Sequence, residues 1–136
     1  MRALSKVLFI LFACTILLPT RAHAQVNNFT ITDYRIEYHL SRDQAQHSIL
    51  KTTETITADF RIPNQNHGIE RAIPTDYDGH PTNVKILSVQ DESGNNRQYR
   101  TYASNGNLVV RIGDPDTYVL GKQTYVITYS QQDVTK

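Results

Sequence analysis

The stretch Leu50–Phe60 reads LKTTETITADF, and its residues alternate between two kinds of position. The even positions carry Leu, Thr, Glu, Ile, Ala and Phe, whereas the odd positions carry Lys, Thr and Asp. Successive side chains of a β-strand point to opposite faces of a sheet. This period of two therefore predicts a strand whose even face is buried and whose odd face meets water. Glu54 is the one charged residue on the face that we expect to be buried.

More strands are predicted on both sides of this stretch. Upstream, Tyr34–Leu40 alternates apolar and polar residues and is expected to be half-buried. Val84–Val89 is apolar enough to be mostly buried. The other predicted strands are Gly68–Ile73, Gln98–Ala103, Leu108–Ile112 and Gln123–Tyr129.

Turn sequences separate these strands, and no segment after residue 24 has helical spacing. Residues 91–96 (DESGNN) form one turn cluster. Asn105-Gly106 suits a two-residue hairpin loop, because both of its residues must take a positive φ. We therefore expect an all-β, antiparallel β-sandwich, with Greek-key connections as one option, and a small β-barrel as the alternative fold.

The N-terminus predicts a secretory signal peptide over residues 1–24. Arg2 and Lys6 give a positive start, residues 7–18 form a short apolar run, and Ala22-His23-Ala24 is a cleavage site of the A-x-A type. The run is shorter than the roughly 20 residues that a membrane-spanning helix needs. We expect cleavage after Ala24 and a single exported β domain at residues 25–136, in the periplasm or another extracytoplasmic space.

The charge and cysteine content restrict the possible partners. Residues 25–136 carry 11 Lys and Arg against 13 Asp and Glu, a net charge of −2, with no basic stripe. That balance argues against nucleic acid as a partner. The one cysteine, Cys14, lies in the predicted leader, so the exported domain is expected to have no disulfide and to depend on a packed core.

Four segments together resemble a known family. They read ITDYRIEYHL, TTETITADF, HGIERAIPTDYDGHP and VRIGDPDTYVLGKQTYVITY, and they occur in this order between residues 31 and 129. The most specific pieces are residues 68–74, Gly-Ile-x-Arg-x-Ile-Pro, and residues 111–115, Arg-Ile-Gly-Asp-Pro. The chain is similar to the N-terminal exported domain of the YciQ-like predicted membrane proteins, a domain-of-unknown-function family.

The resemblance implies an exported fold and supplies no activity. In that family, further sequence and transmembrane helices follow the exported domain, whereas this chain stops at Lys136. Membrane association is therefore expected only if such downstream sequence is missing from this chain. A domain lacking its last strands is also consistent with that end point.

The segment His67–Pro81, HGIERAIPTDYDGHP, is the densest in His, Pro and Gly, and it has three possible interpretations. A metal site would use His67, His80, Asp76 and Asp78, but the two histidines are far apart in sequence, and the twelfth position of a calcium loop starting at Asp76 falls on Leu87. Catalysis lacks a G-x-S-x-G or H-E-x-x-H motif and a cysteine nucleophile outside the leader. We therefore expect no enzyme activity, no catalytic residue, no metal ligand and no cofactor.

The third interpretation of this segment is a constrained crossing loop. Pro74 and Pro81 restrict the residues before them to extended geometry, and Asp78-Gly79 supplies a turn. Ordered loops on sandwiches are also where partners bind, so Tyr77, Asp78 and His80 are the candidate partner or ligand contacts.

Glu54 and Arg71 are predicted to have a structural role. Each lies on the apolar face of its predicted strand, and buried charges are almost always paired. We expect the two to meet across adjacent antiparallel strands, and the alternative is that each reaches solvent separately.

Two functions from different classes follow. The first is a non-catalytic exported module that contacts an unknown protein or envelope component. The second is a cation- or glycan-binding module that uses the loop at residues 76–80 or the turn at residues 114–116.

Overall fold

The computed structural model describes residues 28–135, so the predicted signal peptide lies outside the described residues. All regular structure in this range is β-strand, and no helix in it is long and apolar enough to cross a membrane. The strands are β1 (Thr30–Arg42), β2 (Ser48–Phe60), β3 (Ile69–Pro74), β4 (Asp76–Tyr77), β5 (His80–Pro81), β6 (Lys85–Gln90), β7 (Tyr99–Ser104), β8 (Asn107–Ile112) and β9 (Gly121–Gln132).

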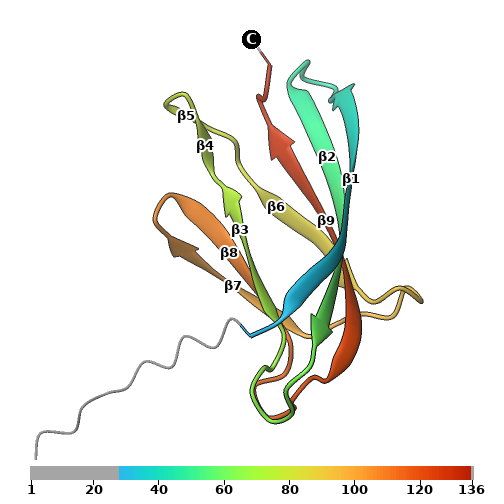
Figure 1. Cartoon of the computed structure of the whole chain (residues 1–136). Coiled ribbons are helices and arrows are strands. Elements are labelled where there is room, and N and C mark those ends of the chain that lie inside the picture. The colour runs from blue at the N-terminus through green and yellow to red at the C-terminus, as the bar shows by residue number, and fades with distance from the viewer. Residues whose placement is uncertain (1–27, 136) are drawn as a thin grey trace, which may run out of the picture.

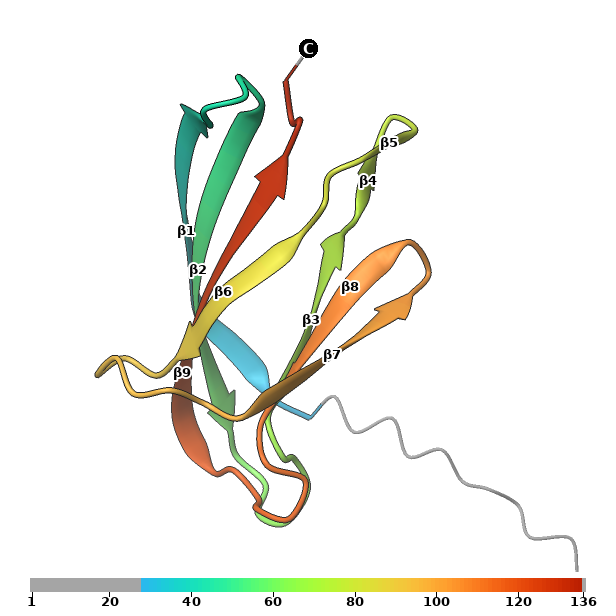
Figure 2. The same ribbon diagram turned by 180° about the vertical axis from the view of Figure 1, so that it is seen from behind.

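The strands form two antiparallel sheets and one short ribbon. The four-stranded sheet has the order β1-β2-β9-β6, the three-stranded sheet has the order β3-β8-β7, and β4 pairs with β5. The two sheets face each other, lying close together at one end and diverging toward the β4–β5 ribbon (Figures 1 and 2). Neither sheet closes on itself. The predicted β-sandwich is therefore confirmed, and the alternative of a small barrel is wrong.

The core lies between the sheets at their close end. Along β2 the even positions are buried except Leu50, which is half-buried, and the odd positions are more exposed, as the alternation predicts. Ile56, Ala58 and Phe60 project from β2 toward the other sheet and are at most 4% exposed. They belong to one apolar cluster with Ile69, Ile73, Val89, Val110, Ile112, Tyr125, Ile127 and Tyr129.

Two expectations about burial are wrong. The alternation in Tyr34–Leu40 predicts a strand that buries its apolar face, but Tyr38 is 66% and Leu40 57% exposed. β1 is an edge strand beside β2, and all of its residues except Ile36 are exposed. The predicted buried strand Val84–Val89 forms as the other edge, β6, where Val89 is buried and Leu87 is exposed.

The two most specific pieces of the family resemblance meet in space. Gly68 precedes β3 and Gly113 follows β8, and they have φ values of +139° and +134°. A Cβ atom on Gly68 would lie 1.8 Å from the carbonyl oxygen of Ile112, and one on Gly113 would lie 1.8 Å from that of His67. Only glycine allows this close backbone approach. The glycines of both pieces therefore have a structural explanation.

The predicted Asn105-Gly106 hairpin is confirmed. These residues connect β7 to β8, Ser104 pairs with Asn107 across the loop, and the two loop residues have φ values of 49° and 73°. Two consecutive positive φ values are those of a type I′ turn, whose twist matches that of the flanking strands.

Candidate functional site

The segment that bears the predicted contact residues folds as a hairpin, which lies in the chain between β3 of one sheet and β6 of the other. Tyr77 pairs with His80, and Asp78-Gly79 form the turn with φ values of 51° and 77°. The Asp76 Oδ1 atom accepts a hydrogen bond from the Gly79 N–H at 2.9 Å. The predicted turn is thus confirmed, whereas the short ribbon on either side of it was not foreseen.

The base of this hairpin is bonded to both sheets. Its two ends are joined by a hydrogen bond of 2.8 Å from the Thr82 N–H to the Thr75 carbonyl. The Thr75 N–H donates to the Gly106 carbonyl in the β7–β8 loop at 3.1 Å, and the Thr82 carbonyl accepts from the Gln132 N–H of β9 at 2.7 Å. The predicted crossing segment is therefore present, because the chain leaves the three-stranded sheet at β3 and enters the four-stranded sheet at β6.

The structure brings Tyr77, Asp78 and His80 together at the tip of the hairpin (Figure 1). Tyr77 is 74% exposed, more than any other large hydrophobic residue described. Because directly paired residues project to the same face of an antiparallel ladder, Tyr77 and His80 share one face. The tip therefore offers a phenol ring, an imidazole and a carboxylate on a rigid base.

The four candidate metal ligands do not lie together in one site. His67 and His80 lie beyond opposite ends of β3, and the His67 ring lies 3.0 Å from the Thr117 carbonyl and packs on Tyr118. Within residues 28–135 no three His, Cys, Asp or Glu side chains are grouped as a metal site requires. In the other candidate turn, the Asp114 carboxylate accepts hydrogen bonds from the Asp116 N–H and the Thr117 hydroxyl.

Glu54 and Arg71 form the predicted ion pair, although not between adjacent strands. The Arg71 Nε and Nη2 atoms donate to the two Glu54 carboxylate oxygens at 2.6 and 2.9 Å. The Tyr129 hydroxyl donates to Glu54 Oε1 at 2.8 Å. Glu54 lies on β2 of the four-stranded sheet and Arg71 on β3 of the three-stranded sheet, so the pair crosses the sandwich. The expected route across neighbouring strands is wrong, because the chain changes sheet between β2 and β3.

The electrostatics of this cluster suit an ion pair that joins the two sheets and has a structural role. Burial alone would raise the pKa of Glu54, which is 1% exposed, but the hydrogen bonds from Arg71 and Tyr129 and the Arg71 charge hold that pKa below its ordinary value. The hydrogen bonds to Glu54 raise the pKa of Arg71. Burial, together with the Glu54 carboxylate, raises the pKa of Tyr129. Glu54 is therefore ionised at neutral pH and is a poor proton donor.

Sequence reasoning missed two tyrosines of this cluster, Tyr34 and Tyr129, and one surface depression. Tyr129 shares a face of β9 with Tyr125 and Ile127, but nothing local shows which tyrosine reaches Glu54. A depression of about 610 Å³ at the close end of the sandwich is lined in part by Phe29, His67 and Tyr99. Of the charged residues that line it, Glu70 and Arg111 are paired with each other at 2.7 Å, and we assign no ligand to it.

Comparison of the chain with protein-family models, with curated proteins and with solved structures gave no match.

Proposed function

We propose that this chain is an exported, non-catalytic β-sandwich module that binds another protein or an envelope component through the tip of the β4–β5 hairpin. The observation that carries the proposal is Tyr77, which is 74% exposed on a hairpin whose base is hydrogen-bonded to both sheets. A tyrosine on a hairpin that is anchored at its base offers a large amphipathic contact, and its side chain has few rotatable bonds to immobilise on binding. Asp78 and His80 add polar groups that can orient a partner.

The chemistry of the interior supports a non-catalytic role. Glu54 is the one acid among the buried residues of the described chain, and its carboxylate is bonded to Arg71 and Tyr129. An acid held beside a guanidinium stays ionised and does not supply a proton at neutral pH.

A photo-cross-linking amino acid in place of Tyr77 tests the contact in the source cells. We expect a covalent adduct of one defined mass after illumination. The same amino acid in place of Tyr118 is the control, because Tyr118 is 51% exposed but lies in the loop that precedes β9. Equal labelling from both positions, or no adduct from position 77, would contradict the assignment.

A melting curve separates this function from cation or glycan binding at the same hairpin. A ligand present at a hundred times its Kd adds about 2.7 kcal/mol to the free energy of unfolding. We expect no shift with calcium, zinc or a panel of envelope glycans. A shift that disappears in His80→Ala would instead identify the hairpin as a small-ligand site.

The proposed export has its own test. Mass spectrometry of the protein from its cells should find Gln25 at the N-terminus, because the A-x-A site ends at Ala24. A protein that retains Met1, or that carries a lipid on Cys14, would show that the proposed extracytoplasmic location needs revision.

A further inference from the structure

The free edge of β1 is the least expected feature of the fold. Among the described strands β1 pairs only with β2, and most of its side chains are exposed, although Tyr34 reaches Glu54 and Arg71. The exposure changes sharply from one strand to the next: Ile56 of β2 is 4% exposed, while its partner Tyr34 on β1 is 46% exposed. An edge with unpaired backbone groups and an apolar face is a template for another strand.

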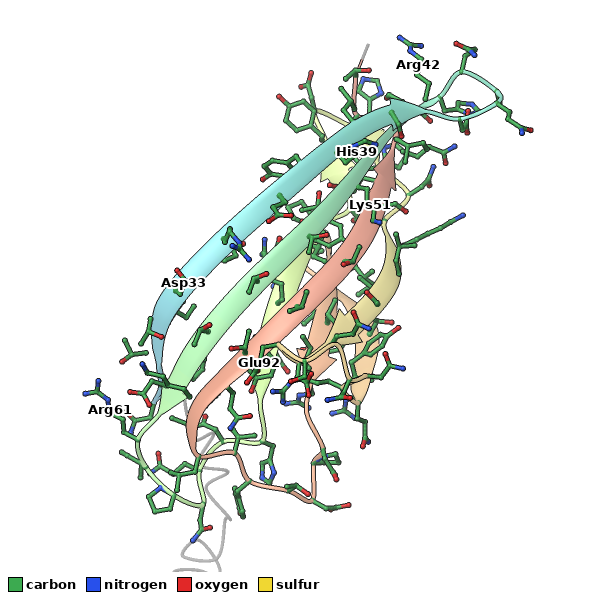
Figure 3. All side chains as sticks on the ribbon, turned by 90° about the vertical axis from the view of Figure 1, so that its right-hand side faces the viewer. Asp33, His39, Arg42, Lys51, Arg61 and Glu92 are labelled. Atoms are coloured by element: carbon green, nitrogen blue, oxygen red, sulfur yellow. The ribbon has the colours of Figure 1, made fainter. Side chains whose placement is uncertain are left out.

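The residues on the two faces of β1 show what kind of strand would fit. Residues 33–39 read DYRIEYH. The face turned toward the interior of the sandwich carries Tyr34, Ile36 and Tyr38, whereas the outward face carries acids and bases in alternation, Asp33, Arg35, Glu37 and His39. Figure 3 labels Asp33 and His39 toward the two ends of β1 and shows no described strand beyond it.

This seven-residue segment is complementary to a second copy of itself that runs antiparallel to it. When two copies are aligned so that Ile36 lies opposite its own counterpart, Arg35 lies opposite Glu37 of the other copy and Asp33 lies opposite His39. On the other face, Tyr34 lies opposite Tyr38. Opposite charges and aromatic pairs directly across a ladder are the contacts that stabilise antiparallel strands.

Neighbouring registers lose this match. Sliding one strand by two residues in one direction puts Asp33 opposite Glu37 and Arg35 opposite itself. Sliding it in the other direction puts Arg35 opposite His39 and Glu37 opposite itself. A slide by one residue would bring apolar residues opposite charged ones, because the side chains of a strand alternate with a period of two.

The geometry of β1 permits this pairing. The register with β2 shifts between Ile31 and Asp33 and is regular from Asp33 to Arg42, so residues 33–39 lie in the regular part. The Arg35 and Glu37 side chains are 68% and 69% exposed and within 3.6 Å of each other. β3 is bonded to β2 through Arg71 and Glu54, and no described strand lies beyond β1, so that edge is open to a second copy.

We propose that the protein forms a two-fold symmetric dimer in which β1 pairs antiparallel with β1 of a second copy, centred on Ile36. The two four-stranded sheets become one continuous sheet of order β6-β9-β2-β1-β1-β2-β9-β6. The interface is isologous, as expected for a self-complementary surface. It is separate from the hairpin proposed to bind a partner, which lies on the other sheet's side of the molecule (Figure 1).

Charge reversals test the register by sedimentation velocity over a concentration series. Arg35→Glu places two carboxylates opposite each other at both symmetry-related positions, and Glu37→Arg does the same with two guanidinium groups. Each single variant should weaken the dimer roughly tenfold or more, since an attractive pair becomes a repulsive one twice. The double variant Arg35→Glu with Glu37→Arg restores opposite charges and should restore the parent Kd.

Mixing the two single variants gives a result that no other occupant of this edge would give. Each variant is repelled by its own copies, but the Arg35→Glu chain is complementary to the Glu37→Arg chain, so the mixture should form a heterodimer. Lys85→Glu on the exposed face of the opposite edge strand, β6, is the control, because it makes the same change in net charge as Arg35→Glu. It should leave the dimer unchanged. Unaltered melting temperatures would show that the variants fold.

A cysteine in place of Ile36 tests the centre of symmetry in a Cys14→Ser background. Facing Cα atoms on antiparallel strands are roughly 4.5–5.5 Å apart, within the range a disulfide requires, so oxidation should yield a covalent dimer. The matched variant Tyr38→Cys should yield far less, because position 38 lies opposite Tyr34 in this register. A protein that stays monomeric at every concentration, or a dimer that is indifferent to the charge reversals, would overturn the proposal.

Discussion

Substitution of Arg71 by alanine is the most direct test of what holds the two sheets together. Arg71 is the residue of the three-stranded sheet that bonds the buried carboxylate of Glu54 in the four-stranded sheet. In Arg71→Ala, the Glu54 carboxylate keeps the hydrogen bond from the Tyr129 hydroxyl but loses its counter-charge. The variant should be much less stable than the parent, because an ionised group would remain buried without its partner.

The magnitude follows from the geometry. Removing one partner of a buried ion pair costs about 3–5 kcal/mol. Arg71 is 29% exposed, so water can enter part of the space it leaves, and we expect about 3 kcal/mol, in the lower half of that range. The reverse change, Glu54→Leu, should cost less, because Arg71 can keep part of its charge in water.

Urea denaturation of the single and double variants measures the coupling. The pair Glu54→Leu with Arg71→Met should recover most of the lost stability, since an apolar pair replaces a buried ion pair at little cost. Adding Tyr129→Phe should recover the rest by removing a hydroxyl that has lost its acceptor.

A surface ion pair serves as the control for this double-mutant cycle. Arg61 lies 3.0 Å from Asp59, but its side chain is 74% exposed, so Arg61→Ala should change the free energy of unfolding by about 0–1 kcal/mol. If Arg71→Ala unfolds at the same urea concentration as the parent, or if the coupling energy lies within about 0.5 kcal/mol of zero, the cross-sheet ion pair is not what stabilises the sandwich.

Three further outcomes are expected. Gly68→Ala should destabilise well beyond Gly94→Ala, because both positions have positive φ but only the Gly68 Cβ would lie 1.8 Å from a backbone oxygen of β8; equal melting temperatures would mean that the approach is looser. Gly106→Val should cost roughly 1–2 kcal/mol through the positive φ of the hairpin, which a melting curve indistinguishable from the parent's would contradict. The lowered folded pKa of Glu54 means that its stabilisation is present above its ordinary pKa of 4.5 and is lost as the pH falls through the lower folded value, so urea melts should show an acid-dependent loss that Glu54→Gln reduces.

Local patterns predicted the strands well because they act within one strand or one turn. The alternation in Leu50–Phe60 reports which face of β2 is buried, and Asn105-Gly106 reports a turn that few other residues can make. The Glu54–Arg71 pair was also predictable, since two charges on apolar faces need partners. None of these inferences requires knowledge of how the sheets are assembled.

Most of the failures concern long-range placement. The order β2-β9-β6 inserts the last strand between two earlier ones, and no short window of sequence carries that information. The alternation in Tyr34–Leu40 correctly predicts a strand but does not say whether another sheet covers its apolar face. The β4–β5 ribbon has two residues in each strand, too few to show a period.

The sequence correctly predicted which segment holds Tyr77, Asp78 and His80, but it did not predict that this segment folds as a two-stranded hairpin. Asp78-Gly79 indicated the turn, and the structure adds that Tyr77 and His80 lie opposite each other on one face. The bonds that fix the base of the hairpin come from Thr75 and Thr82 to residues far away in the chain, at Gly106 and Gln132. Such contacts form only once both sheets are in place, so they have no local signature.

The residues of β2 explain why the hairpin proposed for binding lies where it does. From Phe60 back to Ile56, the inward side chains are apolar, and the sheets lie close together around them. At Glu54 and Thr52 the inward residues become polar, and the sheets are joined there by an ion pair and a tyrosine hydroxyl rather than by apolar contact. Beyond this point the sheets diverge, and the hairpin at that end has its own bonds to both sheets. The change from apolar to polar residues along one strand thus marks where the closed end of the sandwich gives way to its open end, at which the β4–β5 hairpin lies.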